Sequence, residues 1–70
     1  MSGGLREGDR VGRFVVIRDR DGHMHAVSAS GVGAMCEGDG GVVLLLPGGR
    51  LIIVERPLSV LLVWFDGGRA

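Results

Sequence analysis

The stretch that decides the fold runs from Val42 to Glu55 and reads VVLLLPGGRLIIVE. Its first five residues, Val42 to Leu46, are apolar at every position, which is typical of a strand covered on both faces. Leu46-Pro47-Gly48-Gly49 then places proline and glycine where a type II turn requires them, because proline sets φ and glycine accepts a positive φ. Arg50 to Glu55 returns as a second strand. The stretch therefore predicts a β-hairpin.

Short strands and tight turns are also expected before this hairpin. Fourteen glycines among 70 residues divide the chain into segments too short for long helices. Arg13 to Arg20 begins with aromatic and β-branched residues, and Asp21-Gly22 is a pair favoured in two-residue hairpin turns. Strands at His23 to Ser28 and Gly33 to Glu37 follow, joined by a short connection at Ala29 to Val32. We expect a mainly β fold, a five-stranded antiparallel meander curled into a small barrel or half-barrel.

The last apolar segment is compatible with two structures. Pro57 suits the first turn of a helix, one face of which would carry an apolar row. The row consists of Leu58, Leu61, Leu62 and Phe65. The opposite side is also apolar, with Val60, Val63 and Trp64. One thin sheet cannot cover both sides, so either a second subunit covers the rest or the segment is a sixth strand, which its Val, Trp and Phe content also permits.

Length and charge bound the class of protein. Seventy residues predict one small domain at 13–66, with a flexible N-terminal segment at 1–12 and a tail at 67–70. Eight acidic residues balance eight basic ones, so the chain lacks the broad positive field of a non-specific nucleic-acid binder. The opening residues contain no apolar core of a signal peptide, and no apolar run approaches the ~20 residues that span a bilayer. We expect a cytoplasmic protein without membrane contact.

Few residues suggest chemistry. His23 and His25 would share one face of a strand, and Cys36 would add a thiolate if its strand paired beside them. With at most three ligands we expect solvated histidines, no metal and no cofactor. Cys36, between Met35 and Glu37, is expected to be a small buried hydrophobe rather than a nucleophile. Serines are present, but without a nucleophile-elbow pattern, so we expect no catalytic residues and no enzyme.

Three arginines on the first long strand are the one feature compatible with nucleic acid. Arg13, Arg18 and Arg20 could form a basic strip, although Asp19 and Asp21 interrupt it. The few aromatic residues lie in apolar contexts and do not suggest a stacking platform. A charged strand edge that limits strand pairing is the simpler interpretation.

Turns and aliphatic runs follow one another in an ordered set: Ile17 to Gly22, Val27 to Val32, Val42 to Leu46, Pro47 to Gly49, Leu51 to Glu55 and Leu58 to Leu62. This set resembles the FlbD family, short bacterial proteins encoded among flagellar genes. The strand and turn spacing is also similar to that of LytTR DNA-binding domains. The opening of the first long strand is similar to that of the tryptophan-responsive RNA-binding attenuation proteins. These resemblances imply a bacterial protein related to motility or regulation.

The leading functional hypothesis is a non-catalytic protein-interaction module that works as an obligate homo-oligomer with an unknown protein partner. The expected subunit interface lies on the terminal segment and comprises Leu58, Val60, Leu61, Val63, Trp64 and Phe65. The alternative is a small transcriptional or RNA regulator that gathers its arginines into one surface by oligomerising.

Overall fold

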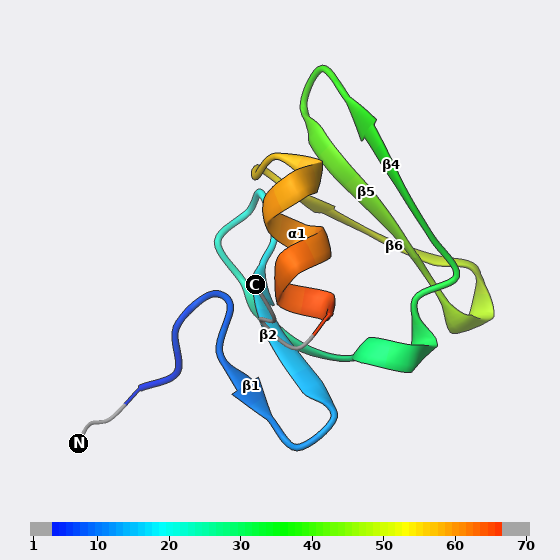
Figure 1. Ribbon diagram of the computed structural model, residues 1–70. Helices are drawn as coiled ribbons and strands as arrows, with labels where there is room; N and C mark the ends of the chain where they lie inside the picture. Colours follow the sequence, from blue (N-terminus) through cyan, green and yellow to red (C-terminus); the bar gives the residue numbers. More distant parts are fainter. Residues whose placement is uncertain (1–3, 67–70) are drawn as a thin grey trace.

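The protein, described here for residues 4–66 by a computed structural model, consists of six strands, two short 3-10 turns and one helix (Figure 1). The elements are β1 (Arg10–Val11), β2 (Phe14–Arg18), β3 (Met24–Ser28), η1 (Ala29–Gly31), β4 (Ala34–Gly38), β5 (Gly41–Leu46), η2 (Pro47–Gly49), β6 (Arg50–Val54) and α1 (Leu58–Phe65). Residues 1–3 of the expected flexible segment and the expected tail at 67–70 lie outside the described residues.

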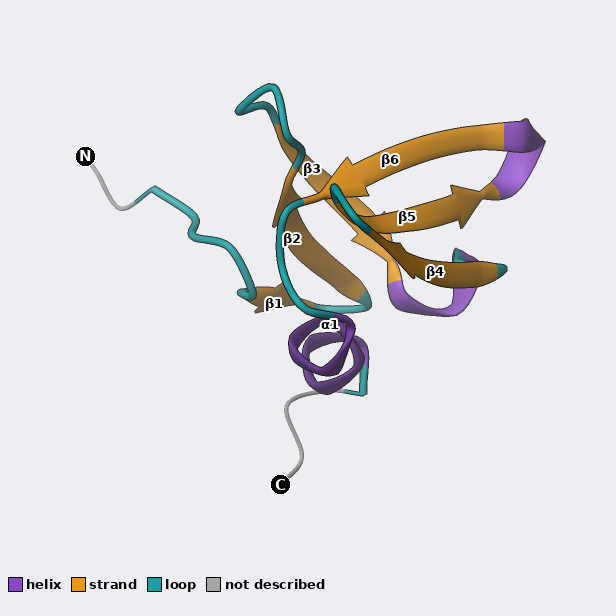
Figure 2. Ribbon diagram, turned by 90° about the horizontal axis from the view of Figure 1, so that it is seen from above, coloured by secondary structure: helices purple, strands orange, loops and turns teal. Residues whose placement is uncertain are grey.

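The prediction of a five-stranded meander curled into a barrel is wrong. The strands form two separate antiparallel sheets of three strands, ordered β1-β2-β3 and β4-β5-β6 (Figure 2). The chain leaves the first sheet at Ala29, whose N–H donates to the carbonyl of Arg13, and joins the second at Gly33, whose N–H donates to the carbonyl of Leu45. The 3-10 turn between these two residues redirects the chain, so that β4 pairs with β5 instead of β3.

Side chains alternate between the two faces of each strand, and those that point between the two sheets form the core. In the second sheet β5 is central, and the cross-strand row Met35–Leu44–Ile52 faces inward. Ile17 and Leu44 are fully buried. The buried cluster comprises Val15, Ile17, Val27, Val42, Leu44, Ile52, Val54 and Leu61. Burial of large aliphatic side chains at about 1.5–3 kcal/mol each is the main stabilising contribution in a domain of this size.

The terminal segment is a helix and not a sixth strand. Pro57 precedes α1, and the N–H of Leu58 donates to Oε2 of Glu37 on β4 at 3.1 Å, so a strand side chain accepts a hydrogen bond from the first turn. The buried side differs from the expected one, because Leu62 is 53% exposed while Trp64 packs against the core cluster. No helix in residues 4–66 has the length and apolar character needed to cross a membrane.

Residues just before β1 bond to the backbone of β2 at Val16. The N–H of Gly8 donates to the carbonyl of Val16, and the N–H of Val16 donates to the carbonyl of Asp9. The Val16 residue is 2% exposed, although it is not a member of the core cluster. A side chain at Gly8 would collide with the indole of Trp64 at 2.7 Å, which shows how closely this segment lies against α1.

Candidate functional site

The outer surface of the second sheet is apolar on all three strands. Residues directly opposite one another in antiparallel strands share a face, and the inward row Met35–Leu44–Ile52 alternates with outward rows. We call these outward residues the outer sheet face: Ala34, Cys36, Val43, Leu45, Leu51 and Ile53. None of the six carries a charge.

Exposure of the outer sheet face is substantial. Leu51 is 63% exposed and Leu45 is 42% exposed, Ala34 and Cys36 are also exposed, and only the central Val43 and Ile53 are half-buried. Contiguous exposed apolar surface commonly marks an interaction site. The sequence pattern contained the signal, because an uninterrupted apolar strand must place half of its side chains on each side. The assumption that both sides are covered within one subunit concealed it. Cys36 is exposed on this face instead of buried as expected.

The residues expected to form the subunit interface on α1 are mostly engaged within the protomer. Leu61 is fully buried, so its side chain offers no surface to a second subunit. Val63 is 49% exposed. The remaining expected residues are half-buried, namely Leu58, Val60, Trp64 and Phe65. The exposed apolar surface of the helix therefore consists of Val63 and its neighbour Leu62.

The histidines lie beside an aspartate that the sequence interpretation passed over. Oδ2 of Asp19 lies 2.7 Å from Nε2 of His25 and 3.7 Å from Nδ1 of His23. Cys36 belongs to the other sheet, so the expected His-His-Cys combination is not assembled. Carboxylate oxygens of Asp19 and Asp21 and a ring nitrogen of His23 do lie within 4.8 Å of one another.

The turn between β2 and β3 accounts for this cluster. The N–H groups of Asp21 and His23 both donate to Oδ1 of Asp19, and the N–H of Gly22 donates to its carbonyl. Asp19 pairs with His23 across the turn, so the loop has three residues with Gly22 at φ +93°, not the expected two-residue turn at Asp21-Gly22. An aspartate side chain at the start of a turn commonly accepts a hydrogen bond from the backbone N–H two residues later. The position of Asp19 at the start of this turn is the sequence signal that could have identified it.

These bonds change the acidity of the Asp19 carboxyl. The hydrogen bond from His25, followed by that from the His23 amide, lowers the pKa of Asp19 from its usual 3.8 to about 2. Asp19 is therefore ionised at neutral pH, and Nε2 of His25, only 2.7 Å away, must carry the proton of that hydrogen bond. The hydrogen bond between Asp19 and His25 fixes the orientation of the imidazole on β3.

The pH dependence of the free energy of unfolding should report the hydrogen bonds to the Asp19 carboxylate. A carboxyl whose folded pKa is depressed stabilises the fold above its unfolded pKa and loses that contribution as pH falls through its folded pKa. We expect the urea midpoint to drop between pH 3.8 and about 2, and to drop less steeply in Asp19→Asn. Urea unfolding from pH 6 to pH 2 measures this, with Asp39→Asn in the β4–β5 turn as the control. Equal slopes in wild type and Asp19→Asn would contradict it.

The three arginines expected to form a basic strip do not share a common setting. Arg18 bonds to Glu7 at 3.3 Å, and the same carboxylate accepts a hydrogen bond from Arg56. Donation from Arg56, assisted by Arg18, holds the pKa of Glu7 below its usual value. The Arg13 guanidinium lies 5.7 Å from the ring centroid of Phe14. Arg20 lies in the turn between two aspartates.

The serines are not placed beside the histidines as a nucleophile requires. Ser28 and Ser30 lie with their hydroxyls 3.4 Å apart, whereas His25 bonds to Asp19 and Ser59 is exposed on α1.

Comparisons with protein-family models, with curated proteins and with solved structures found no significant match to this chain. Function must therefore be argued from the surfaces of the molecule itself.

Proposed function

We propose that this chain is a non-catalytic, cytoplasmic protein-interaction module that works as a homo-oligomer. The observation that carries the proposal is the outer sheet face, where three adjacent strands expose only apolar side chains. Its connection to motility or regulation rests on the resemblances to the FlbD family, the LytTR domains and the RNA-binding attenuation proteins.

A second copy of the chain is the occupant that suits this face best. The face carries no charge and the whole chain has a formal net charge of zero, so two copies meet without electrostatic repulsion. A two-fold axis through the centre of the face would pack sheet on sheet with the same residues on both sides. Stable interfaces bury roughly 800 Å² per partner. The six residues would form the apolar centre of such a contact, and we expect dissociation in the micromolar range.

The arrangement of the arginines favours self-association over the alternative of a small nucleic-acid regulator. A nucleic-acid surface requires a continuous row of cations free of carboxylates. Arg18 instead shares Glu7 with Arg56, and Asp19 and Asp21 flank Arg20. These ion pairs and neighbouring carboxylates weaken the field that phosphate binding would need.

Introducing a charge at the centre of the outer sheet face tests the proposal. We expect Leu45→Arg to raise the dissociation constant more than tenfold, because burial of the apolar centre would require burial of an unpaired charge on each subunit. Sedimentation equilibrium between 1 and 200 µM, roughly the range of transient dimers, measures the change. Circular dichroism checks that the variant stays folded.

A matched substitution distinguishes the two apolar surfaces. Val63→Arg places the same charge on the exposed side of α1 and should leave assembly intact. Loss of assembly in Val63→Arg but not in Leu45→Arg would place the interface on the helix, as expected from the sequence. A wild-type chain that remains monomeric across the concentration range would contradict self-association altogether.

A further inference from the structure

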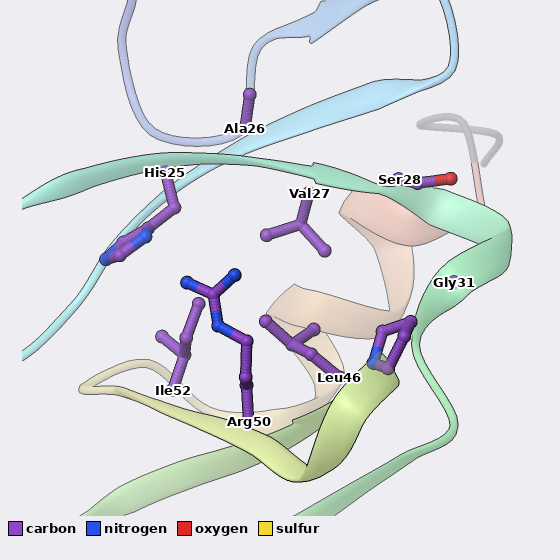
Figure 3. A pocket seen from close by; sticks show the side chains of 9 residues that line it. His25, Ala26, Val27, Ser28, Gly31, Leu46, Arg50 and Ile52 are labelled. Atoms are coloured by element: carbon purple, nitrogen blue, oxygen red, sulfur yellow. The ribbon is translucent and has the colours of Figure 1, made fainter.

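An open groove separates β3 from β6, the adjacent edges of the two sheets. Side chains from both strands and from the β5–β6 turn line a cavity of about 310 Å³ (Figure 3). Its apolar walls are formed by Val27, Leu46 and Ile52. A second cavity of about 230 Å³ shares His25, Arg50 and Ile52 with the first and reaches the β2–β3 turn. The two cavities form one continuous groove along the edge of the protein, which borders the outer sheet face at Leu51 and Ile53 and does not include Leu45.

The backbone of β3 presents unpaired groups along this groove. In an antiparallel pair, bonded and non-bonded residue pairs alternate. Asp19 and His23 are a bonded pair, so Ile17 with His25 and Val15 with Val27 are bonded as well. Ala26 lies between them, and its N–H and C=O point away from β2. Neither group has a hydrogen-bond partner among residues 4–66.

The backbone of β6 presents a second free edge. The carbonyl of Ile53 accepts a hydrogen bond from the N–H of Arg20, so Ile53 directs its backbone groups away from β5. Leu51 has the same orientation two residues earlier, and within the described part of the chain its N–H and C=O have no partner. Free strand edges of this kind accept an additional strand.

The Arg20–Ile53 hydrogen bond closes one end of the groove. Its 2.9 Å length brings the β2–β3 turn into contact with β6, and at the other end Gly31 lies beside the ring of Pro47. Because the groove is bounded at both ends, a polypeptide enters it from the solvent side, and an internal segment would also have to leave on that side. The groove therefore suits the end of a polypeptide better than an internal segment.

Charge inside the groove selects the kind of chain end. The guanidinium of Arg50 lies between the two strands, on the side of His25 and Val27 (Figure 3). Among the described residues it forms no ion pair and no hydrogen bond, so its five donors are free for a ligand. A planar carboxylate matches a guanidinium with two parallel hydrogen bonds. Asp19 and Asp21 line the second cavity and would repel a doubly charged phosphate more strongly than a singly charged carboxylate.

We propose that this groove binds the carboxyl-terminal residues of an extended peptide. The peptide would add a strand between β3 and β6, bonding to Ala26 on one side and to Leu51 on the other, with its terminal carboxylate on Arg50. Apolar side chains of the peptide would contact Val27 and Ile52. The inserted strand would join the two sheets into one.

The experiment uses two pools of fluorescent hexapeptides, randomised at every position, one with free carboxyl termini and one amidated. Peptides are selected on the immobilised wild-type chain, and their affinities are measured by fluorescence polarisation. We expect peptides from the free-carboxylate pool to bind, and the amidated form of each to bind at least tenfold more weakly. Arg50→Gln should weaken binding by at least tenfold, whereas the control Arg13→Gln should leave it unchanged. Arg50 is exposed, so this substitution leaves the core intact.

Hydrogen exchange separates strand addition from simple anion binding. A bound peptide should slow exchange of the Ala26 and Leu51 amides, whereas acetate at Arg50 should not. The proposal is overturned if no peptide is selected, if amidated peptides bind equally well, if Arg50→Gln has no effect, or if the two amides remain unprotected. Leu45→Arg should keep its peptide affinity, so failure of self-association and failure of the groove are distinguishable.

Discussion

Gly41→Ala is expected to abolish the cooperative unfolding transition of this domain. Gly41 begins β5 with φ +127°, a conformation that costs other residues roughly 1–3 kcal/mol. A Cβ at this position would also collide with the carbonyl oxygen of Val54 and approach Cα of Glu55 at 3.1 Å. Both obstacles are backbone, so β6 must shift away from β5. A core of this size supplies only ~3–5 kcal/mol, which the combined cost matches or exceeds.

The residue opposite Gly41 provides the control. Gly38 pairs with Gly41 across the β4–β5 turn, and a Cβ there meets nothing within 4 Å. We expect Gly38→Ala to change the free energy of unfolding by less than about 1 kcal/mol. Thermal circular dichroism and urea titration at one protein concentration compare the two variants. A Gly41→Ala protein that unfolds cooperatively within 5 °C of Gly38→Ala, about 1 kcal/mol, would contradict the argument.

Part of the local turn structure was readable from the sequence, namely the hairpin from Val42, whereas the two-residue turn expected at Asp21-Gly22 is a three-residue loop. Pro47 is followed by Gly48 at φ 81° and ψ 11°, the values of the third residue of a type II turn, so the hairpin from Val42 forms where the pattern places it. The apolar run after Pro57 was compatible with a helix and with a sixth strand, and the structure has a helix whose buried side differs from the expected one.

Long-range arrangement was not readable in the same way. Nothing in the residues from Ala29 to Gly33 distinguishes a turn that continues one sheet from a turn that begins another, since both need only a short flexible connection. Burial of Trp64 depends on Gly8, more than fifty residues earlier, whose lack of a side chain permits the contact. The outer sheet face and the groove both arise from this division into two sheets. The sequence pattern therefore predicted neither site, although the apolar runs of β5 and β6 contain most residues of the outer sheet face.

Two adjacent leucines on α1 allow the packing to be tested within a single turn of the helix. Leu61 is fully buried in the core cluster, whereas Leu62 is 53% exposed. Truncation of a buried leucine to alanine costs about 2–5 kcal/mol, because the apolar contacts are lost and a cavity remains. Leu61→Ala should therefore lose most or all of its folded population at 25 °C. Leu62→Ala, which keeps the same helix propensity within a few tenths of a kcal/mol, should stay folded.

Urea unfolding followed by Trp64 fluorescence and by circular dichroism, at one fixed concentration, compares the pair. Fixed concentration is necessary because self-association adds stability that depends on the amount of protein. The indole of Trp64 packs against the same cluster as Leu61, so its emission should shift to the red in Leu61→Ala and not in Leu62→Ala. If Leu62→Ala were the more damaging change, the helix would be rotated by about 100° from the orientation described, and the sequence-based assignment of Leu62 to the core side would be restored.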